Sequence, residues 1–229
     1  MTTLAGPGAT LVCLHRRLDW VEAVARNHAD WRAVVHGGPC RIRLFEPARP
    51  VLSLGRRATT RPDRATAATI ALASARGLAI VDDDRGGLAT LHLPGQLVAL
   101  IAMPIERAAI AAFVGGALSR IASVCVAAGM PDVEVVTDGP DVGLWYRSAK
   151  LVSVGLRHAD GVVRHGFAVN VAVVDDLASG LLLCGRPTRE LANLSDGGAR
   201  RSVHSIAVDV AAALVSARGI GHSDSAPPR

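Results

Sequence analysis

Within residues 78–171, short apolar runs separated by turn residues occupy 78–103 and 133–171, and this pattern restricts the chain to a fold that contains a β-sheet. Runs of this length bounded by Gly, Pro and Asp are typical of strands. The turns are predicted at Pro94-Gly95, at Asp138-Gly139-Pro140 and at Asp160-Gly161. The predicted strands are Leu78–Val81 (expected to be buried), Leu88–His92, Gln96–Met103, Val133–Val136, Val142–Tyr146, Lys150–Arg157 and Val162–Val171.

Helical patterns lie on both sides of this stretch. Asp19 is expected to cap a helix that runs to about Val35. Thr66–Arg76 is rich in alanine and predicts a second helix, which Gly77 is well placed to end. The remaining predicted elements are the strands Leu11–His15, Arg41–Phe45 and Val51–Leu54 and the helices Thr188–Leu194 and Val203–Arg218.

The longest predicted helix, Arg107–Gly129, is apolar on most sides and is expected to be central. Gly115-Gly116 and Arg120 interrupt its apolar sequence, which favours a buried helix over a membrane span. The N-terminal sequence lacks the basic and apolar regions of a signal peptide. We therefore expect a soluble, cytoplasmic protein.

Strands and helices are mixed along the chain without repeats or a clear linker, so residues 1–218 are predicted to form one α+β domain. Hydrophobic residues make up 50% of the sequence but aromatic residues only 3%, so the core must consist of Val, Ala, Leu and Ile. Residues 219–229 are mostly small and polar and end in Pro-Pro-Arg, which predicts a disordered tail.

The net charge of +5 favours acidic partners. The arginines are scattered, and no run of aromatic residues suited to base stacking accompanies them. This pattern disfavours nucleic acid, which requires a clustered basic patch. An acidic protein partner remains, and no membrane partner is expected.

Lysine occurs once, at Lys150, whereas arginine occurs 24 times. A lysine in a dry pocket can lose its proton and an arginine cannot, so this residue is a candidate for proton transfer. A bias towards arginine, with one lysine left over, is the alternative. The four cysteines lie far apart, without metal-binding spacing, and are predicted to be free thiols: Cys13, Cys40, Cys125 and Cys184.

Three segments combine residue types that carry chemistry. The first, Arg85–Gln96, begins with a glycine pair that allows close approach of a ligand to the backbone. The second joins Lys150–Gly155 to His165–Asn170. The third is Cys184-Gly185, where the glycine leaves space beside a thiol. Taken singly, a tight turn, a core histidine and a buried cysteine would explain these features.

In order, these segments read Arg-Gly-Gly, Thr-x-His-x-Pro-Gly-Gln, Lys-x-x-x-x-Gly, His-Gly-x-Ala-x-Asn and Cys-Gly. This order resembles the lipoyl(octanoyl) transferases, which share a superfamily with the biotin and lipoate protein ligases. The resemblance runs from about Phe45 to Leu194, and Glu46…Leu54-Gly55-Arg56 is similar to an early segment of the family. It implies a mixed β-sheet with packed helices, like the catalytic domain of the ligases.

The resemblance implies transfer of an octanoyl group from acyl carrier protein to a lysine of a lipoyl domain. The lipoyl domain would belong to a 2-oxoacid dehydrogenase complex or to the glycine cleavage H protein. The family's nucleophilic cysteine and its lysine fall on Cys184 and Lys150, and a monomer without cofactor or metal is implied. The family's substrate-binding stretches fall on Arg85, Gly86, Gly87, Leu88, Ala89, Thr90, Leu91, His92, Ser153, Val154, Gly155, His165, Gly166, Phe167 and Ala168.

Such a site is chemically coherent. A thiolate is the nucleophile, so Cys184 needs a base or a cation, and Lys150 can serve as either. Attack on a carrier thioester gives an acyl-cysteine of similar energy, so ATP is not required. Backbone N–H groups around Gly185 or Gly86-Gly87 are candidate donors to the oxyanion of each step.

Two residues depart from the family pattern. Leu93 replaces a glycine in the stretch from Thr90 to Gln96, where the acyl chain or the backbone would pass closely. Pro47 stands about where the family has a histidine. Both changes affect the expected acyl-chain length, and Leu93 is expected to shape the acyl pocket.

Three other functions remain open. An ATP-dependent lipoate or biotin ligase would keep the lysine but would not need Cys184. A non-catalytic module would bind a lipoyl domain or an acyl carrier without turnover. A cysteine hydrolase would use His92 or His165 as its base. In such a site water would compete with the acceptor amine of a transfer reaction unless the site closes.

Overall fold

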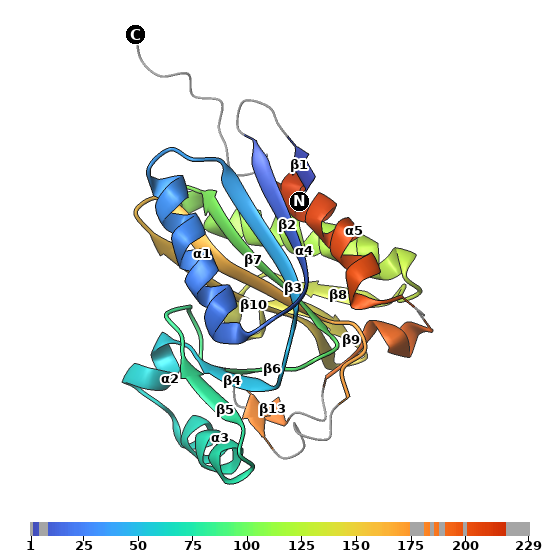
Figure 1. Cartoon of the computed structure of the whole chain (residues 1–229). Coiled ribbons are helices and arrows are strands. Elements are labelled where there is room, and N and C mark those ends of the chain that lie inside the picture. The colour runs from blue at the N-terminus through green and yellow to red at the C-terminus, as the bar shows by residue number, and fades with distance from the viewer. Residues whose placement is uncertain are drawn as a thin grey trace.

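The computed structural model describes residues 2–4, 9–174, 181–183, 186–187, 191–198 and 201–218, and for residues 2–4, 182–183 and 186–187 the backbone alone. Two sheets and their helices account for most of these residues (Figure 1). The predicted α+β fold class is confirmed, with a mixed sheet and packed helices.

The large sheet has eight strands. β2 pairs with β3 in parallel, and every other neighbouring pair among the described strands is antiparallel. Their order across the sheet is β1 (Thr2–Leu4), β2 (Thr10–Leu18), β3 (Cys40–Pro47), β7 (Gln96–Pro104), β11 (Val162–Asn170), β10 (Ala149–Ala159), β9 (Gly143–Tyr146) and β8 (Val133–Val136).

Helices cover both faces of this sheet. Helix α1 (Trp20–Val35) lies on one face, and α4 (Ile110–Ala127) and α5 (Val203–Ala217) lie on the other (Figure 1). Successive side chains of a strand point to opposite faces. In β7, Leu97 and Ile101 accordingly join the core with α4 and α5, whereas Val98 and Leu100 pack on the α1 side.

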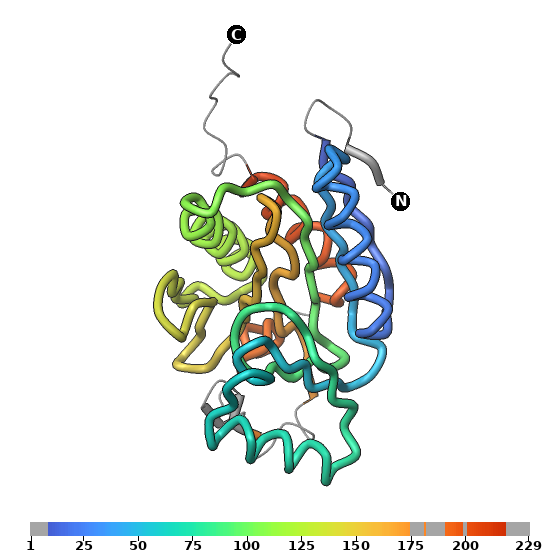
Figure 2. Tube along the Cα trace, turned by 90° about the vertical axis from the view of Figure 1, so that its left-hand side faces the viewer, coloured from blue at the N-terminus to red at the C-terminus, as the bar shows by residue number. Residues whose placement is uncertain are grey.

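A smaller sheet lies at one end of the molecule (Figure 2). Its central strand β4 (Val51–Leu54) pairs in parallel with β5 (Ala79–Asp82) and antiparallel with β6 (Ala89–His92). The short helix α2 (Arg56–Thr60) and the longer α3 (Arg64–Ala75) connect β4 to β5. Two short strands, β12 (Leu182–Leu183) and β13 (Arg186–Pro187), pair antiparallel, and β12 contacts α3 and β6 of this unit.

Most predicted elements occur within a few residues of their expected bounds. The Asp19 carboxylate accepts a hydrogen bond from the Val21 N–H at 3.0 Å, so Asp19 caps α1 as predicted. Helix α3 starts at Arg64, two residues before the predicted start, because Asp63 caps it through the Thr66 N–H at 2.7 Å.

The predicted burial of the strand at residues 78–81 is wrong. None of the four residues of β5 is buried, because β5 is an edge strand that pairs with β4 alone among the described strands.

The predicted central position of the long helix is also wrong. A 3-10 turn at Arg107–Ala109 leads into α4, which buries one side against the sheet and α5 and leaves residues such as Val126 exposed. By length and composition alone the helix would fit a membrane span, and 39% of its most apolar window is buried here. A helix of the core meets the same two criteria.

The predicted helix Thr188–Leu194 is wrong for its described residues, because 191–193 are not helical. Leu191 forms a parallel bridge with Lys150, and the Ala192 N–H donates to the Lys150 carbonyl at 3.0 Å. Pairing with β10 therefore outweighs local helix propensity. A 3-10 turn, Leu194–Gly197, follows, and a further one, Gly139–Asp141, precedes β9. Residues 188–190 and the predicted tail 219–229 lie outside the described residues.

Candidate active site

The loop between β5 and β6 carries a buried arginine. The Arg85 guanidinium donates to the Ser53 carbonyl and hydroxyl, both at 2.8 Å, and to the Gly86 carbonyl at 3.0 Å. The Asp83 carboxylate lies 3.8 Å from Arg85 Nε and compensates part of its charge. Arg85 is thus held between the small sheet and its own loop.

The glycines of this loop allow close backbone packing. The Gly86 N–H donates to the Leu156 carbonyl at 2.9 Å, which joins the loop to β10 of the large sheet. A Cβ at Gly55 would lie 2.6 Å from the Gly87 carbonyl oxygen, so the start of α2 also packs on the loop. The Arg-Gly-Gly segment therefore connects the two sheets.

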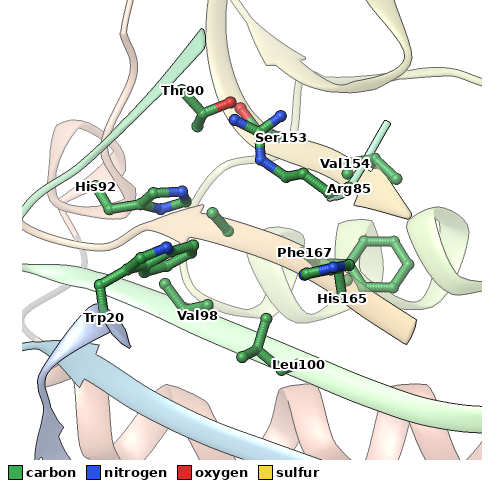
Figure 3. Close-up of a pocket in the computed structure, with 13 residues that line it drawn as sticks. Trp20, Arg85, Thr90, His92, Val98, Leu100, Ser153, Val154, His165 and Phe167 are labelled. Carbon is green, nitrogen blue, oxygen red and sulfur yellow. The ribbon is translucent and has the colours of Figure 1, made fainter. Parts of the chain in front are cut away.

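A cavity lies between the loop, β6, β7, β10 and β11 (Figure 3). Its apolar lining includes Val98 and Leu100 of β7 and Phe167 of β11, and its polar lining includes Arg85 and His165. An apolar cavity with a few polar groups is typical of a small-molecule or acyl-group site.

The structure brings ten of the fifteen predicted substrate-binding residues to this cavity. They are Arg85, Thr90, His92, Ser153, Val154, Gly155, His165, Gly166, Phe167 and Ala168. The other five do not line it: Gly86 and Gly87 are exposed in the loop, and Leu88, Ala89 and Leu91 pack in the core of the small sheet. Sequence reasoning missed Trp20, Val98 and Leu100, which also line the cavity.

The free space in the cavity is about 30 Å³. By this measure one water needs about 10–15 Å³, so the space holds about two water molecules. The Trp20 and His92 rings stack at the cavity, with centroids 3.8 Å apart and planes inclined by 19° (Figure 3). An acyl chain of several carbons therefore enters only when lining side chains such as these two move.

His92 is a neutral imidazole. Burial, and then the charge of Arg85, lower its pKa well below the usual range. Its Nε2 lies 3.2 Å from the Ser53 hydroxyl, and Nδ1 has no hydrogen-bond partner among the described residues. His92 thus adds a polar but uncharged group to the cavity.

His165 belongs to a network of charged groups that begins at the cavity. Its Nε2 lies 2.7 Å from the Asp84 carboxylate, which also pairs with Arg164 and Arg157. Burial raises the pKa of Asp84, but the hydrogen bond from His165 and the charges of Arg164, His165 and His28 outweigh it and lower that pKa to about 2. Asp84 is therefore ionised at neutral pH.

Asp83, Asp84 and His165 each offer a metal-ligand atom, and these atoms lie within 4.8 Å of one another. Arg164 and Arg157 already pair with Asp84, and Arg85 lies beside Asp83. Three guanidinium groups at this distance repel a cation, so the arrangement favours an ion-pair network over a metal site.

Lys150 lies near the start of β10, half-buried, with Nζ 4.9 Å from the centre of the Trp145 ring. Its carbonyl accepts a hydrogen bond from Asn170 Nδ2 at 3.1 Å, and Asn170 Oδ1 accepts one from Gln96 Nε2 at 2.9 Å. Gln96 and Asn170, both part of the sequence motifs, thus fix the backbone that carries the lysine. Lys150 is not among the residues that line the cavity.

Cys184 lies outside the described residues, so its predicted pairing with Lys150 stays a prediction. The strands on either side of it, β12 and β13, pair antiparallel. The other three cysteines are free and buried. Burial raises the pKa of Cys40 and raises that of Cys125 to about 12, so neither of these two is a reactive thiol.

The two departures from the family pattern do not line the cavity. Leu93 is 2% exposed, packs in the core of the small sheet and does not line this cavity, so its role in shaping the acyl pocket stays a prediction. It faces a separate groove with Pro94 and Val174. Pro47 is buried at the end of β3, opposite Leu18 of β2.

Comparisons with known proteins agree with the sequence resemblance. Residues 18–214 match the family described as the lipoyl protein ligase A/B catalytic domain. An octanoyltransferase of Chloroflexus aggregans is 34% identical over 197 residues, which are 81% of this chain and 84% of the relative. One of Chloroflexus aurantiacus is 35% identical over 64% of this chain, and the match spans 65% of that relative, just under two thirds.

A Xenopus tropicalis mitochondrial octanoyl-[acyl-carrier-protein]:protein N-octanoyltransferase is 35% identical over 38% of this chain and 36% of its own length. Solved structures share the fold at low identity. Lipoate-protein ligase A bound with ATP superposes with a TM-score of 0.66 at 15% identity, over 91% of this chain and 82% of that one. A Thermoplasma acidophilum lipoate protein ligase with bound lipoic acid gives 0.65 at 15%, over 90% and 83%. The chain therefore belongs to the lipoyl protein ligase A/B catalytic domain family.

Proposed function

We propose that this chain is an octanoyltransferase that moves an octanoyl group from acyl carrier protein to a lysine of a lipoyl-domain protein. The observation that carries the proposal is the cavity, because ten residues of the motifs that resemble the transferases line it. The Chloroflexus aggregans octanoyltransferase, similar over 81% of this chain, supports the same activity.

The first half of the proposed reaction forms an acyl-cysteine. The Cys184 thiol gives its proton to Lys150, and the thiolate attacks the carbonyl carbon of the carrier thioester. The carbon–sulfur bond to the carrier breaks, and the carrier sulfur takes this proton from Lys150 and leaves as a thiol. One thioester replaces another, so the step needs no ATP.

The second half forms an amide. The amine of the acceptor lysine attacks the acyl-cysteine and gives a proton to Lys150. The carbon–sulfur bond to Cys184 breaks, and Lys150 passes the proton to the Cys184 sulfur, which becomes a thiol again. An amide is more stable than a thioester, which makes this half strongly favourable. Arginine at position 150 would keep the positive charge but not the ability to accept a proton.

The cavity suits the hydrocarbon part of the acyl group. Leu100, Val154 and Phe167 form apolar walls, and Ser153 lies three residues along β10 from Lys150. At roughly 3.3 Å per residue, this spacing corresponds to about 10 Å along the strand. An acyl chain that starts near Lys150 would therefore run along β10 into the cavity.

Two alternatives make different predictions. An ATP-dependent ligase would form the amide from the free acid and ATP without a reactive cysteine. A binding module would hold the carrier or the lipoyl domain without acylation. We favour the transferase over the ligase because the chain offers Cys184, which a ligase would not need. We favour it over the binding module because a binding-only protein has no use for a matched amine and thiol. We further propose a cytoplasmic location, for which the sequence pattern is the support.

The test is intact-protein mass spectrometry after the purified chain is mixed with octanoyl-acyl carrier protein. We expect one added octanoyl group that hydroxylamine removes. The adduct should be lost in Cys184→Ala and strongly reduced in both Lys150→Ala and Lys150→Arg. Cys13→Ala removes a different thiol and should still be acylated. A folded protein that never forms the adduct, yet forms the amide from octanoate and ATP, would establish the ligase instead.

A further inference from the structure

Positive charge is concentrated in the helical segment that connects β4 to β5 of the small sheet. Residues 55–82 contain five arginines and two aspartates, a net charge of +3 out of +5 for the whole chain. Four of these arginines lie within nine residues, and all four are exposed: Arg56, Arg57, Arg61 and Arg64. We call these four the α2 arginines.

Among the described residues, the α2 arginines form no ion pairs with acidic residues, unlike three other exposed arginines. Arg17, Arg26 and Arg49 pair with Glu46, Glu22 and Asp19 at 2.7–3.2 Å. Within the described part of the chain, no comparable ion pair is formed by any of the α2 arginines.

Asp63, the acidic residue nearest to the α2 arginines in the sequence, caps the start of α3. Hydrogen bonds from Thr66 lower its pKa, and the charge of Arg57 lowers it further. Its carboxylate therefore remains ionised and in place, but one acid cannot neutralise four guanidinium groups. The surface keeps a net positive charge.

Backbone hydrogen bonds fix α2 directly on the loop that borders the cavity. The Arg56 N–H donates to the Arg85 carbonyl at 3.0 Å, and the Arg57 N–H donates to the Gly87 carbonyl at 3.2 Å. Arg85 itself lines the cavity (Figure 3). A partner bound to the α2 arginines thus lies beside the loop that forms one wall of the acyl site.

We propose that the α2 arginines are the docking surface for an acidic face of the acyl carrier protein that delivers the acyl thioester. This inference rests on the proposed function and adds the location of the donor. The carrier must place its thioester arm at the cavity, and α2 lies on the cavity's own loop. Opposite charges on the two proteins speed the encounter more than they tighten the complex.

The test compares two charge reversals of equal size. Arg57→Glu/Arg61→Glu changes the proposed surface, where the four-residue spacing places both side chains on one side of the turn. Arg32→Glu/Arg107→Glu changes two exposed arginines, one at the end of α1 and one before α4. Both pairs alter the net charge by the same amount, so a difference between them reports position.

Each variant is assayed with two donors at low ionic strength: octanoyl-acyl carrier protein and the small thioester octanoyl-N-acetylcysteamine. With the carrier, we expect Arg57→Glu/Arg61→Glu to lower kcat/KM by about tenfold or more, because steering changes association rates by this order. Arg57→Lys/Arg61→Lys should restore most of it, and the control pair should lose no more than about twofold. With the small thioester, all variants should match the unchanged chain.

An equal loss in both reversed pairs would overturn the proposal, because the overall field and not the α2 arginines would then matter. A loss with the small thioester, or a raised KM for the lipoyl-domain acceptor alone, would also overturn it. Failure of the unchanged chain with both donors would instead refute the proposed function.

Discussion

Gly166 allows a decisive test because the sequence and the structure assign it different roles. The resemblance implies that it binds substrate. In the structure it lies on β11 opposite Leu100 of β7, and a Cβ added to it would overlap the Ala99 carbonyl oxygen. Gly166 therefore also lets the two central strands of the large sheet approach each other.

The cost of Gly166→Ala follows from this overlap. Cβ atoms essentially never lie closer than 3.0 Å to a heavy atom of this kind, so the backbone of β7 or β11 must move. Overpacking of a rigid interior costs about 1–3 kcal/mol. Loss of one ladder hydrogen bond adds about 1 kcal/mol. We expect the free energy of unfolding to fall by about 2–4 kcal/mol, which corresponds to a Tm lower by roughly 5–15 °C.

The assay is urea unfolding of Gly166→Ala beside Gly115→Ala. Gly115 lies within α4, and a Cβ there would meet Thr137 Cγ2 at 3.5 Å, an ordinary contact. The control should be neutral or gain about 0.5–1 kcal/mol, because alanine favours a helix. A Gly166→Ala protein as stable as its parent but inactive would refute the packing role and support substrate binding.

Three further substitutions test the site. Leu93→Ala should lower the free energy of unfolding by about 2–5 kcal/mol, because Leu93 is buried. When acyl carriers with different chain lengths compete as substrates, the preferred chain length should not change, since Leu93 does not line the cavity. Trp20→Ala should cost about 3–5 kcal/mol but should shift the same competition towards longer chains, since it opens the cavity. Asp84→Asn should cost about 1 kcal/mol at neutral pH, a value reduced for partial exposure. Because folding lowers the pKa of Asp84 to about 2, this difference in urea unfolding should be complete above about pH 4 and should vanish as the pH falls through 2.

The strands of the large sheet were predictable because turn residues mark their ends. Asp160-Gly161 separates β10 from β11, and the turn shows the backbone that such residues favour, with positive φ at both positions. The Asp19 cap was predictable for the same local reason. Burial depends instead on which strands become neighbours, and this explains the wrong expectation for β5.

The cavity was predictable only where a motif marks it. Arg85, His92 and His165 carry unusual residue types at recognisable spacings, whereas Val98 and Leu100 look like any alternate residues of a strand. Trp20 comes from a distant helix, and nothing in its local sequence indicates that it stacks on His92. Residues brought together by tertiary packing leave no such sequence signal.

Leu181 and Leu191, which lie on either side of Cys184 in the sequence, belong to different parts of the fold. Leu181 is buried in the core of the small sheet, whereas Leu191 forms a bridge with Lys150 on the large one. The two residues of the proposed reaction would therefore depend on both units staying folded. A small unit can open locally while the larger core stays intact. On heating, we expect transfer activity to disappear below the temperature at which circular dichroism reports global melting, because the alignment of these two residues is lost before the fold.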